Sequence, residues 1–258
     1  MFSEAPIGLF DSGVGGLSVW REVVKLLPCE HTVYYADSAY CPYGQKSSGE
    51  IIERSDRIMD FLTGQHQCKL IVVACNTATA AAIDHLRAAY PLPFVGMEPA
   101  VKPAALHSVT GVVGVLATQG TFKGRLYHET LERFAGHVQI IEQPGDGLVE
   151  LVESGHTGGE EAQTLLEKYI RPMLQANIDH LVLGCTHYPF LIPAIRKITG
   201  NRVTILDSAP AVAQRVKFLL SQDRLLNVSG DKARHEFFSS GDINSITDWI
   251  CQFTPHIP

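Results

Sequence analysis

Two stretches of the chain repeat one pattern, IVVACNT at residues 71–77 and LVLGCTH at residues 181–187. Each begins with an apolar run typical of a buried β-strand, and each continues with a cysteine and two polar residues ahead of a predicted helix. A second echo relates IGLFDS at residues 7–12 to VGVLAT at residues 113–118. These two pairs predict two similar halves, each built from strand, polar turn and helix.

Apolar runs alternate with amphipathic stretches along the whole chain, which indicates mainly parallel sheets covered by helices. The proline-rich stretch 91–103 is the expected crossing from one half to the other, and the chain is expected to return near residues 207–210. We therefore predict an α/β protein with two pseudo-symmetric domains, residues 1–97 with 208–258 and residues 98–207. The predicted strands cover residues 7–10, 32–36, 70–74, 112–116, 138–141, 181–183 and 203–206, and the predicted helices cover residues 17–27, 51–62, 76–90, 121–134, 160–175, 191–198 and 209–220.

Composition narrows the class of protein. The chain has 258 residues, 45% of them hydrophobic, and a formal net charge of -6, whereas a dedicated nucleic-acid binder is more often basic. No apolar run approaches the roughly 20 residues that span a bilayer, and the N-terminus does not resemble a signal peptide. We expect a cytoplasmic protein without nucleic-acid or membrane partners.

Six cysteines occur without a CxxC pair, which favours free thiols in a reducing compartment. An isolated cysteine is most often a small buried hydrophobe. We expect that inert role for four of the six, namely Cys29, Cys41, Cys68 and Cys251.

The remaining two, Cys75 and Cys185, stand where predicted strands end, and the same is true of Asp11. Ligands of open α/β sheets bind beyond the carboxyl ends of the strands. The start of a helix also presents free N–H groups and partial positive charge, so we expect the pKa of a thiol there to fall.

Two thiols facing one carbon suit a racemase. Inverting a carbon centre requires one group that removes a proton from one face and another that returns a proton to the opposite face. A thiol, with an ordinary pKa of about 8.5, can serve in either form near neutrality. Asp11 can assist Cys75, and His187 can assist Cys185. Hydroxyl groups and helix-start N–H groups could hold the substrate carboxylates in place of arginine or lysine.

Four motifs closely resemble those of glutamate racemases, members of the aspartate/glutamate racemase family. They are FDSGVGGL at 10–17, PYG at 42–44, ACNTAT at 74–79 and GCTHYP at 184–189, and the likeness runs from about residue 7 to about residue 217. The resemblance implies two α/β domains with the active site in the cleft between them. It further implies interconversion of L- and D-glutamate without a cofactor or metal, supplying D-glutamate for bacterial peptidoglycan.

The resemblance also implies roles for individual residues. Cys75 would act on the D-enantiomer and Cys185 on the L-enantiomer, assisted by Asp11 and His187. Asp37 and Glu153 fall near acidic positions of the family, and Cys41 replaces a larger apolar or aromatic residue before Pro42. The positions that match substrate-binding residues are Asp11, Ser12, Tyr43, Gly44, Asn76, Thr77, Thr186 and His187.

Other interpretations remain open at this point. Gly13-x-Gly15-x-x-Ser18, with Asp37 at the end of the next strand, imitates a dinucleotide-binding fingerprint. That hypothesis leaves both cysteines without a role. A pyridoxal-phosphate racemase is a second alternative, but it needs a lysine that binds the cofactor, and the strand-end clusters of this chain contain no lysine. An aspartate racemase would use the same two cysteines, and a non-catalytic binding protein would not need them. The oligomeric state is open, with a homodimer among the alternatives.

Overall fold

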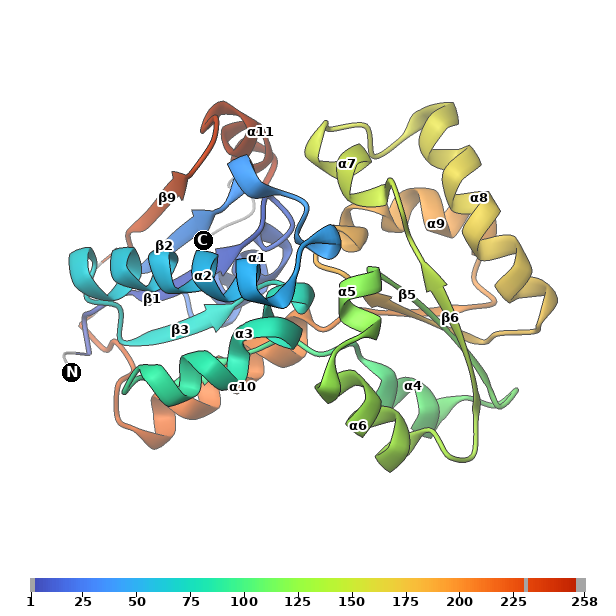
Figure 1. The fold of residues 1–258 in the computed structure, drawn as a ribbon, viewed down its shortest axis with the longest axis horizontal. Helices are drawn as coiled ribbons and strands as arrows, with labels where there is room; N and C mark the ends of the chain where they lie inside the picture. The colour runs from blue at the N-terminus through green and yellow to red at the C-terminus, as the bar shows by residue number, and fades with distance from the viewer. Residues whose placement is uncertain (1–2, 230–231, 254–258) are drawn as a thin grey trace.

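Two parallel β-sheets form the framework of the protein (Figure 1). The structure, a computed structural model, describes residues 3–229 and 232–253. The first sheet has the order β4-β3-β1-β2-β9 and the second has the order β6-β5-β7-β8. The strands are β1 Ile7–Asp11, β2 Thr32–Ala36, β3 Leu70–Val73, β4 Phe94–Val95, β5 Val112–Ala117, β6 Gln139–Pro144, β7 His180–Gly184, β8 Thr204–Leu206 and β9 His235–Ser239.

The two sheets share one strand order. The run β4-β3-β1-β2 of the first sheet corresponds to β8-β7-β5-β6 of the second, and β9 adds an edge strand to the first sheet alone. Strands β1 and β5 carry the IGLFD and VGVLA segments, and β3 and β7 precede the two cysteines. The internal echoes of the sequence therefore mark equivalent strands, and the predicted pseudo-symmetric α/β fold is confirmed.

Helices cover both faces of each sheet because the buried strands are apolar on both faces. On the first sheet, α1 packs with α10 over one face, while α2 packs with α3 over the other. On the second sheet, α8 and α9 cover one face, and α4 and α6 cover the other. The α-helices are α1 Leu17–Leu26, α2 Ser48–Met59, α3 Asn76–Ala89, α4 Val101–His107, α5 Gln119–Phe122, α6 Arg125–Phe134, α7 Leu148–Glu153, α8 Gly159–Gln175, α9 Ile192–Thr199, α10 Ala209–Gln222 and α11 Asn244–Phe253.

Short helical turns complete the framework near the loops, at η1 Ser38–Tyr40, η2 Tyr43–Gln45, η3 Asp60–Gln65 and η4 Tyr188–Leu191. The helix predicted over 121–134 is divided into α5 and α6, because Gly124 is extended and caps the second helix. The sequence reading also missed β4, α4, α7, β9 and α11. The division into residues 1–97 with 208–258 and residues 98–207 stays a prediction.

No helix within the described residues is long and apolar enough to cross a membrane.

Candidate active site

Cys75 and Cys185 line one small enclosed cavity between the two sheets. Its volume is about 10 Å³, roughly the space that one water molecule needs. Both cysteine side chains are buried, at 5% and 7% exposure. Ten other residues share the lining, namely Ser12, Pro42, Tyr43, Gly44, Asn76, Thr77, Thr118, Val149, Thr186 and His187.

The strand order explains why these residues meet. After β1 the chain adds β2 on one side and β3 on the other, so the order reverses between β1 and β3. The second sheet repeats this arrangement between β5 and β7. Open α/β sheets bind ligands at such switch points, beyond the carboxyl ends of the strands. Asp11 ends β1, Cys75 and Cys185 follow β3 and β7, and Thr118 follows β5.

The two cysteines differ in their local structure. Cys75 is the N-cap of α3, and its Sγ accepts a hydrogen bond from the Ala78 N–H at 3.4 Å. Cys185 instead enters a turn, and the 3-10 helix η4 begins only at Tyr188. The expected helix start after both cysteines is therefore found only at Cys75.

The expected fall in the pKa of a helix-start thiol is wrong for Cys75. Burial raises the pKa of the Cys75 thiol above its ordinary range, and the nearby Asp11 carboxylate raises it further. The Ala78 N–H lowers this pKa, but by less. Desolvation of a buried thiolate outweighs the field of one helix terminus here.

Asp11 is fully buried between the two sheets. One carboxylate oxygen accepts a hydrogen bond from the Gly13 N–H at 2.7 Å, and the other accepts one from the Thr186 hydroxyl at 3.0 Å. Burial raises the pKa of Asp11 to about 6, although His187 and these two hydrogen bonds act in the opposite direction. Asp11 thus joins the polar turn after β7 to the end of β1.

His187 lies beside Cys185, with 3.8 Å between its Nδ1 and the Cys185 Sγ. Its Nε2 is 2.6 Å from Glu153 Oε1, which also accepts the Val14 N–H at 2.8 Å. Burial alone would lower the pKa of His187, but hydrogen bonds to Cys185, Cys41 and Glu153 raise it well above its ordinary value. Burial alone would raise the pKa of Glu153, and its contacts with His187 and Val14 lower it instead.

Asn76 is the clearest sign of a ligand site. Its side chain is buried in the cavity lining, yet neither its amide nitrogen nor its amide oxygen has a hydrogen-bond partner among the described residues. Buried polar groups without partners are rare and call for an explanation. A polar substrate in this cavity would supply both partners.

Tyr43 and Gly44 reach the cavity on η2, and a buried network fixes this turn. The Tyr43 hydroxyl donates to Asp37 Oδ2 at 2.5 Å, and Arg54 holds both Asp37 oxygens through bonds of 2.9 and 2.7 Å. Asp37 therefore supports the turn and is absent from the cavity lining. Seven of the eight positions predicted to bind substrate lie in the cavity lining. The eighth, Asp11, accepts a hydrogen bond from Thr186, which is one of the lining residues.

A wider pocket of about 610 Å³ adjoins the enclosed cavity. The two share Pro42, Gly44, Thr77, Thr118 and Val149 as lining residues. The pocket also carries charged groups, Lys46, Lys123, Asp146 and Glu150. The wider pocket therefore leads from the surface to the cavity that the two cysteines line.

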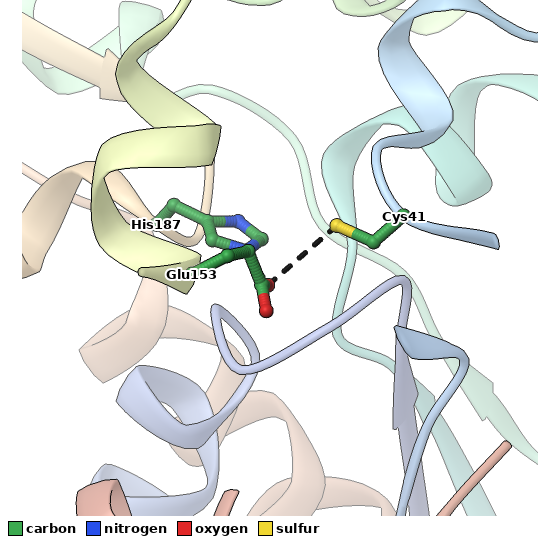
Figure 2. Close-up of side chains that lie close together, drawn as sticks. All are labelled: Cys41, Glu153 and His187. Carbon is green, nitrogen blue, oxygen red and sulfur yellow. Dashed lines mark hydrogen bonds and ion pairs between the residues drawn. The ribbon is translucent and has the colours of Figure 1, made fainter. Parts of the chain in front are cut away.

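Of the four cysteines expected to be buried and inert, only Cys68 is buried. Cys29 and Cys251 are exposed, and Cys41 is only partly buried. The Cys41 Sγ lies 3.6 Å from Glu153 Oε1 (Figure 2), so Cys41 belongs to the surroundings of the site. The sequence reading also overlooked Thr118, although the echo between residues 7–12 and 113–118 aligns it with Ser12 and could have identified it.

The chain is similar to amino-acid racemases in both sequence and fold. The family model of Asp/Glu/Hydantoin racemase matches residues 7–216. A glutamate racemase of Ectopseudomonas mendocina is 50% identical over 242 residues, covering 93% of this chain and 91% of that protein. The structure of a Bacillus anthracis glutamate racemase superposes with a TM-score of 0.86 at 31% identity, covering 99% and 96% of the two chains.

The chain therefore belongs to the Asp/Glu/Hydantoin racemase family of amino-acid isomerases. The Escherichia coli glutamate racemase, solved with L-glutamate and an activator, is also similar, with a TM-score of 0.85 and 35% identity over 96% of this chain and 95% of that one. The predicted resemblance to glutamate racemases is confirmed.

Proposed function

We propose that this enzyme interconverts L- and D-glutamate through Cys75 and Cys185, one acting on each face of the α-carbon. The observation that carries the proposal is the placement of both thiols on one enclosed cavity, each delivered by the equivalent strand of a different sheet. A carbon held between them is accessible to one sulfur on each face. We assign glutamate rather than aspartate as the substrate because the similar proteins are named glutamate racemases.

The two thiols exchange the roles of acid and base between the L-to-D reaction and the D-to-L reaction. The one that is deprotonated removes the α-proton, and the other donates its proton to the opposite face. Burial keeps the Cys75 thiol protonated at neutral pH, ready to act as the acid. Asp11 assists Cys75, and His187 assists Cys185 from 3.8 Å. Following the family resemblance, Cys75 acts on D-glutamate and Cys185 acts on L-glutamate.

Hydroxyl and amide groups of the cavity wall hold the substrate. The orphan amide of Asn76 can both donate and accept a hydrogen bond, and the hydroxyls of Ser12, Thr77 and Thr186 are at the cavity wall. The N–H groups beside Gly44 add donors for a carboxylate. No lysine or arginine lines this cavity among the described residues, so these hydrogen bonds, together with His187, carry the binding.

The reaction as proposed needs neither cofactor nor metal, and we infer that it takes place in the cytoplasm and supplies D-glutamate for peptidoglycan. Residues 1–97 with 208–258 and residues 98–207 are the two domains that part to admit substrate. Assembly into a homodimer is compatible with this function, because the cavity is complete within one chain.

Proton exchange tests the mechanism directly. With L-glutamate in deuterated water, the wild-type enzyme should produce D-glutamate that carries deuterium at the α-carbon. Cys75→Ala and Cys185→Ala should each lower the rate of racemisation by at least about 100-fold, because each removes one acid–base group. Cys68→Ala, a buried cysteine outside the cavity, is the matched control and should retain activity.

A racemisation rate near that of the wild type in either cavity variant would contradict the two-base assignment. A parallel assay with L-aspartate tests the substrate. Faster turnover of aspartate than of glutamate at equal concentration would make the glutamate assignment wrong while leaving the mechanism intact.

A further inference from the structure

Three side chains with metal-binding atoms converge beside the two-cysteine cavity. They are Cys41, from the loop after β2, Glu153, the last residue of α7, and His187, from the turn after β7 (Figure 2). One donor atom from each lies within 4.8 Å of the other two. The proposed racemisation has no use for Cys41. We propose that these three residues form a site for Zn²⁺, and that the bound ion inhibits the enzyme.

The donor set selects the class of metal. A thiolate, an imidazole and a carboxylate together are typical of Zn²⁺, which is commonly bound by three protein ligands with one position left for water. Mg²⁺ and Ca²⁺ prefer sites made of oxygen atoms alone. The site should therefore discriminate strongly against those two cations.

One of the donor distances already suits a tetrahedral ion, and a second must lengthen. Zn–S and Zn–O bonds of about 2.3 and 2.1 Å put sulfur and oxygen about 3.6 Å apart, and Cys41 Sγ lies 3.6 Å from Glu153 Oε1. The same geometry puts nitrogen and oxygen about 3.3 Å apart, whereas His187 Nε2 and Glu153 Oε1 are now 2.6 Å apart. These two atoms must separate slightly when the ion replaces the proton between them.

An outer contact also favours the ion. The Val14 N–H donates to Glu153 Oε1 at 2.8 Å and so orients the carboxylate, a type of support that metal sites commonly have. Cys41 would bind the ion as a thiolate and His187 as a neutral imidazole, so binding becomes weaker as the pH falls.

Inhibition rests on the proposed function. A metal at Nε2 holds His187 as a neutral imidazole with its remaining proton on Nδ1, so His187 can no longer gain and lose a proton beside Cys185. The ion also connects the loop after β2 on the first sheet with α7 and the turn after β7 on the second. The proposed function has the two domains part to admit substrate, and this link would hold them together.

Metal binding can be measured without substrate. A chromogenic chelator that competes for Zn²⁺ should report one ion per chain in the wild type, and Co²⁺ in its place should give a thiolate-to-metal charge-transfer band. Cys41→Ala should lose that band and bind Zn²⁺ at least about 100-fold more weakly, since loss of an outer contact alone costs roughly 10- to 100-fold. Glu153→Gln, a second variant on the opposite side of the site, should also weaken binding. Cys29→Ala, an exposed cysteine, is the matched control and should bind as the wild type does.

Unchanged Zn²⁺ affinity in Cys41→Ala, or binding that requires Cys185 instead, would overturn the site. Half-inhibition of racemisation should then require at least about 100-fold more Zn²⁺ in Cys41→Ala than in Cys29→Ala, each compared with its own metal-free rate. Equal sensitivity of the two variants would overturn the inhibitory role. Zn²⁺ binding through Cys41 in a protein without racemase activity would contradict the proposed function and leave the metal site standing.

Discussion

Replacing Asp11 by asparagine should make the protein more stable and less active. Asp11 is fully buried, and asparagine can keep both of its hydrogen bonds, since its oxygen can accept from the Gly13 N–H and its nitrogen can donate to the Thr186 hydroxyl. The substitution thus removes a buried charge without leaving a gap. Activity should fall because Cys75 loses its neighbouring carboxylate, a trade of function against stability seen at many active sites.

The size of the gain follows from the pKa of Asp11. Burial raises that pKa from 3.8 to about 6, so the folded protein holds the proton more tightly than the unfolded chain does. Ionisation therefore costs stability progressively as the pH rises through this window, and the full cost is present above about pH 6. A shift from 3.8 to about 6 corresponds to about 3 kcal/mol at pH 8 and to about half of that at pH 5.

Urea unfolding at pH 8 and at pH 5 measures this difference. Asp11→Asn should raise the free energy of unfolding by about 3 kcal/mol at pH 8 and by about half of that at pH 5. Asp223→Asn, at an exposed position after α10, is the control and should change it by less than about 0.5 kcal/mol at either pH. A gain for Asp11→Asn that is the same at both pH values would refute the reasoning, because a gain from removing an ionisable group must depend on pH.

Three further substitutions test separate parts of the structure. Gly15→Ala would put a Cβ 2.3 Å from His187 Nδ1, so it should lower kcat by roughly 100-fold with an unchanged circular dichroism spectrum. Lys69→Met should lower the free energy of unfolding in urea by about 3 to 5 kcal/mol, because the buried Glu30 carboxylate, 2.6 Å from the Lys69 ammonium group, would lose its partner charge. Adding Glu30→Gln to this variant should recover part of the loss. Gly147→Ala should cost about 1 to 2 kcal/mol in the same assay, since residue 147 has a φ of +85°.

The sequence predicted the architecture well because the buried strands are short apolar runs that end in recognisable polar turns. β2 runs over the predicted residues 32–36. The elements it missed lack such signals. β4 is two residues long, and β9 has a charged residue among its aromatic ones. Their pairing is decided by neighbouring strands, which local periodicity does not report.

The predicted site residues come together for a topological reason, since each follows a strand at a switch point. The sequence does not predict how deeply these residues are buried or how burial changes their pKa values. Composition and spacing place Cys75 at a helix start, yet its thiol pKa depends on complete burial, which only the packed structure reveals. Cys41 carries no motif that points to a function. It becomes a candidate ligand only because the fold brings it close to Glu153 and His187, which are 112 and 146 positions away in a 258-residue chain.

The glycine-rich turn after β1 shows how one motif can serve two kinds of protein. Gly13 and Gly15 stand where a dinucleotide-binding protein would cradle a pyrophosphate. Here a Cβ on Gly13 would lie 1.9 Å from Glu153 Oε1, and one on Gly15 would lie 2.3 Å from His187 Nδ1. Side chains from α7 and from the turn after β7 thus occupy the space above this turn. The glycines let the two sheets approach closely enough to place Cys75 and Cys185 on one cavity, which is what a two-base racemase requires and a single nucleotide-binding module does not.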